Sequence, residues 1–220
     1  QLFILYIMKV TITEGKSKVI YELPALWNEL TLGRYMRVMK VLKQKEVKNE
    51  YEKVINMINC LSKIPKKDIY SLDMKSINAL GEHISTFLQS KPNEELIHFI
   101  KIQDIEYGFH PSLKDMTLGE FVDLETYMKD IDSNLHRIMS ILYRPLIAKD
   151  EEGHKYAIEE YEPSEERADL FKKHMTVKEF NGASVFFCDL ERQLLNSSLR
   201  SSIQKLKKKR KKRKEEKDKQ

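Results

Sequence analysis

Glycine is scarce and scattered in this sequence, which excludes the loops that most nucleotide-binding enzymes use. Seven glycines are spread over 220 residues, and no two of them are closer than eleven positions. A phosphate-binding loop presents several backbone amides to its ligand and needs clustered glycines to do so. We therefore expect neither P-loop nor Rossmann chemistry.

Cysteine and closely spaced histidine are also nearly absent. Cys60 and Cys188 form no CxxC pair, and the six histidines form no HxH or HxxxH pair. Such spacing indicates neither a zinc site nor a disulfide framework, and it is typical of a reducing compartment. Cys188 follows an apolar stretch, which favours a small buried side chain over a nucleophile.

A calcium loop is excluded as well. The segment 130–134 begins with the acidic spacing of such a loop, but Leu135 stands where the loop needs glycine, and the final glutamate is missing. We expect Asp132, Ser133 or Asn134 to cap the helix that follows. With no cofactor or metal motif, the sequence predicts a binding protein rather than an enzyme.

An enzyme with a site assembled from scattered residues stays open as an alternative. It would require His136, Arg144 and an acid such as Asp123 to meet in one deep cleft. Pairs of adjacent acids could supply general acid and base groups, but such pairs are more typical of solvated loops and first helical turns. These pairs lie at 94–95, 151–152, 159–160 and 165–166.

The apolar run at 2–8 is too short to cross a bilayer, which takes about 20 residues. It also lacks the basic leader and the cleavage site of a signal peptide. Because Gln1 cannot initiate translation, we interpret residues 1–8 as carrying a non-native N-terminal extension that ends at a true start, Met8. The alternative is a short buried strand. We expect no membrane segment and a cytoplasmic protein.

Positive charge is concentrated at the C-terminus. The net charge is +5, yet residues 205–220 carry 11 basic and 3 acidic groups, against 28 and 31 in the rest of the chain. Dense like charges with little to bury predict a tail, residues 199–220, that is disordered when free. Its cations attract phosphates or acidic surfaces, but without aromatic residues they cannot read bases. The predicted contact residues are Lys205, Lys207, Lys208, Lys209, Arg210, Lys211, Lys212, Arg213 and Lys214.

The preceding residues, 9–198, are predicted to form a single α+β domain, predominantly α-helical with small β-hairpins. Alternating apolar residues around turn signals indicate the hairpins, and apolar residues at helical spacing indicate the helices. The expected hairpins span 10–23, 99–109 and 146–158, and the expected helices include 31–45, 51–61 and 74–88.

One type of helix start occurs three times: an apolar residue, then threonine, then an aromatic residue four positions after the threonine. The threonine hydroxyl is expected to cap the first turn, and the apolar residue and the aromatic ring to pack as a hydrophobic staple. Glu120 and Glu179 would complete capping boxes. The three copies are Leu30-Thr31 with Tyr35, Met116-Thr117 with Phe121, and Met175-Thr176 with Phe180.

Pro145 predicts the end of a helix that begins near Leu135, because proline lacks an amide donor and disfavours helix in the preceding residue. Arg144 would then project at a fixed corner, where it pairs with an acid such as Glu166 or contacts a partner. Trp27 is the sole tryptophan, and we expect it in the core.

Several short stretches together resemble a group of small tailed-phage proteins encoded among tail and baseplate genes, described as tail assembly chaperones or structural proteins. The resemblance implies a helper in the host cytoplasm, or a virion-associated component, that shields hydrophobic segments of a tape-measure or baseplate protein. Exposed methionine and aromatic residues on amphipathic helices would form its contact surface. The stretches are Leu23-Pro24 with Trp27, Leu30-Thr31-Leu32-Gly33, Thr117-Leu118-Gly119-Glu120-Phe121 with Asp123-Leu124, Asn134-Leu135-His136, Ile141-Leu142-Tyr143-Arg144-Pro145, Glu166-Arg167-Ala168 with Leu170-Phe171, and Phe186-Phe187.

Two functional hypotheses therefore lead. The first is a protein-binding viral assembly factor, as the resemblance implies. The second is a non-specific nucleic-acid-binding protein that acts through its basic tail. The sequence does not indicate an oligomeric state.

Overall fold

The computed structural model describes residues 8–14, 17–44 and 49–185. Contacts divide the chain into two compact units, residues 1–183 and 184–220, and the first unit is treated below. The predicted domain boundary at residue 198, the basic tail and Cys188 lie outside the described residues, as do residues 1–7 of the predicted extension. The first strand begins at Met8.

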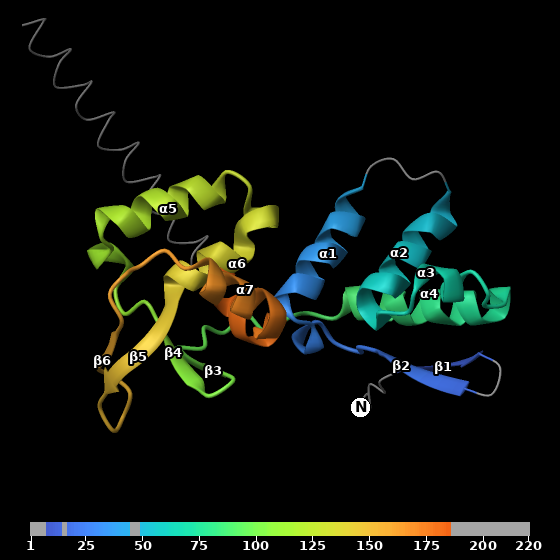
Figure 1. The fold of residues 1–220 in the computed structure, drawn as a ribbon, viewed down its shortest axis with the longest axis horizontal. Helices are drawn as coiled ribbons and strands as arrows, with labels where there is room; N and C mark the ends of the chain where they lie inside the picture. Colours follow the sequence, from blue (N-terminus) through green and yellow to red (C-terminus); the bar gives the residue numbers. More distant parts are fainter. Residues whose placement is uncertain (1–7, 15–16, 45–48, 186–220) are drawn as a thin grey trace, which may run out of the picture. The chain divides into compact units, whose positions relative to one another are not determined.

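The fold is α+β, predominantly helical with two small antiparallel sheets, as the sequence predicts (Figure 1). The first half is mainly helical, and the larger sheet belongs to the second half. The elements are β1 (Met8–Glu14), β2 (Ser17–Leu23), a 3₁₀ turn at Trp27–Glu29, α1 (Leu32–Lys43), α2 (Glu50–Ser62), α3 (Lys66–Ile69), α4 (Met74–Gln89), β3 (Phe99–Ile102), β4 (Ile105–Phe109), a 3₁₀ turn at Leu113–Asp115, α5 (Leu118–Met128), α6 (Ile131–Leu142), β5 (Tyr143–Lys149), β6 (Tyr156–Ile158) and α7 (Glu165–His174).

The N-terminal hairpin pairs β1 with β2 from Met8 opposite Leu23 to Glu14 opposite Ser17. Residues on one strand face alternate sides of a sheet. Ile12 and Leu23 are accordingly buried, whereas Ile20, on the opposite face, is 62% exposed. The predicted hairpin is confirmed.

The predicted helices of the first half are also confirmed, within two residues at each end, as α1, α2 and α4. Helix α4 buries Ile77, Leu80, Ile84 and Phe87 at helical spacing. In α1 the buried residues are Leu32, Val38 and Val41, whereas the other apolar residues that indicated the helix, Tyr35, Met36, Met39 and Leu42, are only half-buried. Trp27 packs against Phe87 and Tyr35, with ring centroids 4.5 and 5.8 Å away, and is 8% exposed. The expectation that Trp27 is a core residue is therefore correct.

The larger sheet has the strand order β3-β4-β5-β6, with every neighbouring pair antiparallel. It contains the second and third predicted hairpins. The turn between β3 and β4 places Gln103 at a φ of 55°, the left-handed region that tight hairpin turns require. Phe171 of α7 meets Tyr107 of β4 edge to face at 5.0 Å, so α7 contributes to the core on this sheet.

Helix α6 passes directly into strand β5 at Tyr143, without a loop. The predicted helix end before Pro145 is thus confirmed. The predicted start near Leu135 is wrong, because α6 already begins at Ile131. The expected caps are wrong too: Asp130 is the capping residue, and its carboxylate accepts a hydrogen bond from the amide of Ser133 at 3.3 Å. The helix starts one turn earlier than its apolar residues alone indicate.

Two of the three repeated helix starts lie against each other. Thr31 and Thr176 form an antiparallel bridge, in which the amide of Leu32 donates to the carbonyl of Met175 at 2.7 Å and the amide of Val177 donates to the carbonyl of Leu30 at 2.8 Å. Helix α1 therefore starts beside the helix that begins at Val177. The bridge joins the two halves of the unit.

The predicted capping chemistry holds fully at one of the three starts. Thr117 and Glu120 form a complete capping box. Thr31 makes no side-chain cap, so the predicted role of its hydroxyl is wrong. At the third start the Thr176 hydroxyl donates to the carboxylate of Glu179, which also accepts from the Thr176 amide at 2.6 Å, so half of the predicted box is present.

The rings of the repeat take different places. Phe180 is 1% exposed and Tyr35 contacts both Trp27 and Phe180, whereas Phe121 is 50% exposed. The bridge explains the difference, because it brings two of the starts together, so that Tyr35, which is half-buried, packs on the buried ring of Phe180.

Candidate functional site

A buried ionic cluster joins the start of α5 to strands β4 and β5. The Oε2 atom of Glu120 accepts a hydrogen bond from the amide of Thr117 at 2.5 Å. Its Oε1 atom lies 2.7 Å from Nη2 of Arg144 and 3.3 Å from Nε2 of His110. All three ionisable residues are at most 7% exposed. One carboxylate therefore closes a capping box and neutralises a buried cation.

The acid predicted for Arg144 was Glu166, and the structure corrects this to Glu120. Glu166 lies exposed in the first turn of α7. The capping box fixes Glu120 at the start of α5, where its carboxylate meets the guanidinium at the beginning of β5. With 5% of its surface exposed, Arg144 offers little to a binding partner.

The charge state of the cluster follows from its surroundings. Burial by itself raises the pKa of Glu120, but hydrogen bonds from Thr117 and the charge of Arg144 outweigh it, so the pKa lies below the ordinary value. Burial lowers the pKa of His110, although the negative charge of Glu120 opposes the shift. The cluster is therefore a buried Glu–Arg pair beside a neutral histidine, which is an arrangement that supports the fold.

The constellation expected for an enzyme is only partly assembled. The Tyr161 hydroxyl donates to Oδ2 of Asp123 at 2.5 Å, and the Arg144 guanidinium lies 5.9 Å from the centroid of the Tyr161 ring. His136 faces α7 instead, where burial and the charge of Lys172 lower its pKa. None of Asp123, His136 and Arg144 lines either of the two grooves described next.

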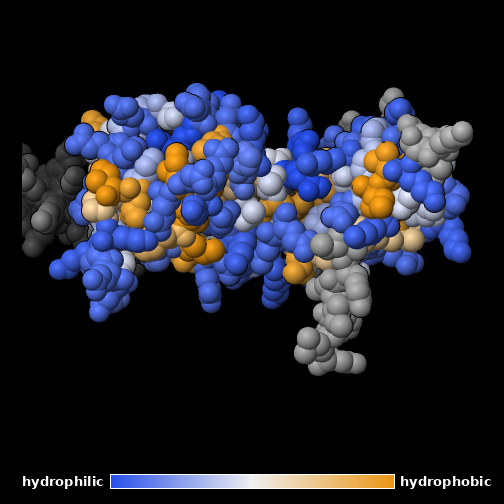
Figure 2. All heavy atoms as spheres, turned by 60° about the horizontal axis from the view of Figure 1, so that its bottom comes forward, coloured by the Kyte–Doolittle hydropathy of each residue, from blue (hydrophilic) through white to orange (hydrophobic). Residues whose placement is uncertain are grey.

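An apolar groove lies among the end of α1, the start of α2 and the end of α4. Its volume is about 290 Å³, near the lower limit of roughly 300 Å³ for small-molecule sites. Leu42, Val54 and Leu88 are half-buried in its walls, and Asn49 and Lys53 are its polar lining residues. On the face shown in Figure 2, apolar side chains likewise form separate patches within a hydrophilic surface. A groove of this size accepts apolar side chains of a partner.

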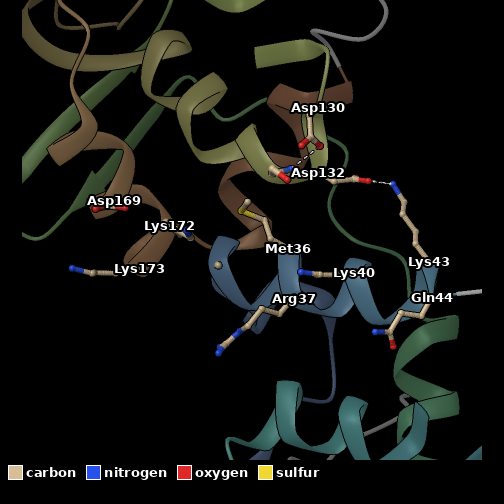
Figure 3. Close-up of a pocket in the computed structure, with 12 residues that line it drawn as sticks. Met36, Arg37, Lys40, Lys43, Gln44, Asp130, Asp132, Asp169, Lys172 and Lys173 are labelled. Carbon is tan, nitrogen blue, oxygen red and sulfur yellow. Dashed lines mark hydrogen bonds and ion pairs between the residues drawn. The ribbon is translucent and has the colours of Figure 1, made fainter. Parts of the chain in front are cut away.

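A larger groove of about 860 Å³ lies among α1, α6 and α7 (Figure 3). Met36, at the centre of the view, is the one apolar side chain among its described lining residues, and the other side chains are polar or charged. The basic residues are Arg37, Lys40, Lys43, Lys172 and Lys173, and the acidic residues are Asp130, Asp132 and Asp169.

Sequence reasoning missed this basic groove. Arg37 and Lys40 are three positions apart on one helix and therefore share a face. Lys172 and Lys173 stand in the last turn of α7, where cations answer the helix dipole. Each pair is visible in the sequence, but only the packing of α1 against α7 brings the two pairs together.

The nine predicted contact residues of the tail, from Lys205 to Lys214, lie outside the described part of the chain. Within residues 8–14, 17–44 and 49–185, no group of three or more His, Cys, Asp or Glu side chains could hold a metal ion. In the same ranges, no helix is both long and apolar enough to span a bilayer.

Comparison with protein-family models, with curated proteins and with solved structures found no match. Function must be argued from the two grooves and from the sequence.

Proposed function

We propose that this chain is a protein-binding assembly factor of a tailed phage, either a tail assembly chaperone or a minor tail or baseplate component. It acts by binding rather than by catalysis, in the host cytoplasm or in association with the virion. Its client is a tape-measure or baseplate protein, of which it shields an apolar helical segment.

The observation that carries the proposal is the apolar groove among α1, α2 and α4. Three helices supply its walls, and the half-buried side chains of Leu42, Val54 and Leu88 are available to an incoming side chain. Amphipathic helices bind such grooves by inserting apolar anchors at helical spacing, while their polar face stays in water. The resemblance of the sequence to tail assembly proteins supplies the biological context.

Exposed aromatic and methionine side chains elsewhere on the helices support the same function. Tyr51 at the start of α2 is 52% exposed, and Tyr70 and Met74 near the start of α4 are 68% and 54% exposed. Such residues contribute large contact areas and adapt to different partners. They are further contact residues outside the groove lining.

The alternative inferred from the sequence, non-specific binding of nucleic acid, rests on the tail. The tail residues 199–220 lie outside the part of the chain that the structure describes. The geometry of the described residues therefore gives no support to nucleic-acid binding by the tail.

The test uses the full-length chain and fluorescent peptides that tile the tape-measure protein encoded by the same genome. We expect at least one amphipathic peptide to bind, and Leu88→Gln to weaken that binding about tenfold, which corresponds to ~1.4 kcal/mol. The matched control is Leu118→Gln on α5, since Leu118 is 78% exposed and is not among the groove-lining residues. Failure of every peptide to bind, or equal effects of the two substitutions, would refute the proposal.

A further inference from the structure

The basic groove carries more positive charge than its own acids neutralise. Lys43 holds Asp132 through both carboxylate oxygens, at 2.7 and 2.5 Å. Asp130 is engaged in capping α6 through the Ser133 amide. Figure 3 shows both interactions at the same end of the groove. The described lining holds five cations and three acids, so the groove carries a net charge of +2.

Four cations of the groove have no ion pair within the described part of the chain. Arg37 and Lys40 extend from α1, and Lys172 and Lys173 extend from the end of α7. All four side chains are exposed. The negative charge of Asp169, another acid of the groove, is too small to balance these four cations, so positive charge remains in excess.

The lining of the groove decides which anion it suits. Interfaces that bind protein have an apolar or aromatic core that supplies most of the affinity. Among the described lining residues, Met36 is the one apolar side chain, and none is aromatic. An acidic protein helix would find charges and the aliphatic stems of the cations, but only Met36 as an apolar anchor. A phosphate backbone requires only cations and hydrogen-bond donors, which these residues provide.

We propose that the groove between α1 and α7 binds the phosphate backbone of a nucleic acid, through Arg37 and Lys40 on one side and Lys172 and Lys173 on the other. The Arg37 guanidinium offers a donor fork that matches phosphate oxygens, and the lysines act as mobile point charges. Because no aromatic side chain lines the groove, bases have nothing to stack on. Binding is therefore independent of base sequence.

The helices that carry the cations pack closely. A Cβ atom on Gly33 would come within 2.7 Å of the Lys172 carbonyl oxygen, so α1 and α7 are in backbone contact there. The Thr31–Thr176 bridge ties the start of α1 to the segment just beyond the end of α7. The backbone positions of the two pairs of cations are therefore set by the packing of α1 against α7.

Like charges are crowded around these helices. Burial, and then the charge of Arg37, lowers the pKa of Arg34. Burial, and then the charge of Lys172, lowers the pKa of His136. The charges of Arg37 and Lys172 thus act on groups beside the groove, in keeping with the excess of cations in its lining.

This site is independent of the protein-binding proposal and separate from the predicted tail. The test measures binding of a fluorescent, unstructured single-stranded oligonucleotide to the full-length chain over a series of salt concentrations. The two groove variants are Arg37→Gln/Lys40→Gln and Lys172→Gln/Lys173→Gln. The control, Lys75→Gln/Lys101→Gln, removes the same charge from exposed positions on α4 and β3.

Each groove variant is expected to lower the slope of log K against log salt by about 1.4, since each phosphate contact contributes roughly 0.7 for single strands. The control should retain the wild-type slope, because the tail contributes equally to all proteins. Thermal unfolding of every variant verifies the fold, which matters for Lys172 and Lys173 at a helix end.

Two results would overturn the proposal. One is an equal slope for groove and control variants, which would leave binding to the tail alone. The other is competition by poly-glutamate that is as effective per charge as competition by unlabelled oligonucleotide, which would assign the groove to acidic protein. The Leu88→Gln variant distinguishes the two proposals. It should lose peptide binding at the apolar groove and keep the wild-type slope of log K against log salt for the oligonucleotide.

Discussion

The rings of Tyr35 and Phe180 meet edge to face with their centroids 5.0 Å apart. Each ring belongs to the fourth residue after a threonine that begins a helix, and the two threonines pair as a bridge. Two copies of one local pattern are thus stapled to each other across the fold.

Replacement of both rings should reveal an interaction that neither single replacement shows. We expect Tyr35→Leu and Phe180→Leu to couple by about 0.5–1.5 kcal/mol in a double-mutant cycle, because an edge-to-face pair is worth that much beyond its buried area. Urea unfolding of the four proteins measures the coupling. A cycle of Tyr51→Leu with Phe180→Leu is the control and should be additive. Additivity of the Tyr35 cycle would contradict the prediction.

Two of the threonines that begin helices, Thr117 and Thr31, should differ when each is replaced by alanine. Thr117 accepts a hydrogen bond from the Glu120 amide, so Thr117→Ala should lower the free energy of unfolding by about 1 kcal/mol. Thr31 makes no such bond, and Thr31→Ala should cost less than about 0.5 kcal/mol. Chemical denaturation of the two variants gives the comparison. The reverse order would show that the hydroxyl of Thr31 has a role that its geometry does not explain.

Acid should destabilise the protein through the buried cluster. His110 has a lowered pKa in the fold, mainly through burial, so the unfolded chain takes up the proton more readily. Its contribution to stability is present above the ordinary histidine pKa of about 6.5 and is lost as pH falls below it. Glu120, whose pKa is also lowered, adds a loss at more acidic pH, as the pH falls through its folded-state pKa.

His110→Gln should therefore flatten the dependence of stability on pH between roughly pH 7 and 5. Urea midpoints at a series of pH values measure the slope. His154→Gln, at a side chain that is 78% exposed, is the control and should keep the wild-type slope. The assignment fails if His110→Gln and the wild type lose stability in parallel.

Two helical glycines should respond oppositely to alanine. A Cβ atom on Gly81 meets no atom within 4 Å, so Gly81→Ala should stabilise the protein by about 0.4–1 kcal/mol. On Gly33 the same atom would lie 2.7 Å from the backbone oxygen of Lys172, and such overpacking typically costs about 1–3 kcal/mol. Thermal melting of both variants checks the signs. Stabilisation by Gly33→Ala would mean that α1 and α7 can separate without cost.

Local patterns predicted the elements well, because alternation and helical periodicity depend on neighbours in the chain. The hairpins at 10–23 and 99–109 and the helices α2 and α4 follow directly from such patterns. The misplaced start of α6 has a local cause. Its first turn is polar apart from Ile131, which is 40% exposed, so the buried apolar residues that signalled the helix begin only at Leu135.

Contacts between segments that are far apart in the chain could not be predicted from local sequence patterns. Glu120 was correctly assigned to a capping box, but its second oxygen turns toward Arg144, and no spacing rule relates those two residues. The basic groove has the same origin, since α1 and α7 are separated by most of the chain. Counting charges along the sequence drew attention to the basic tail. It could not show that the pair Arg37 and Lys40 and the pair Lys172 and Lys173 come together in the folded domain.

The bridge between Thr31 and Thr176 also has a consequence for synthesis. The acceptor for the amide of Leu32 is the carbonyl of Met175, which a ribosome adds more than 140 residues after Leu32. Until then the first turn of α1 lacks this acceptor, and Tyr35 has no Phe180 to pack against. A nascent chain that stops short of Met175 therefore exposes surface that the finished fold covers, and α1 completes its packing only after residues 175–180 are made.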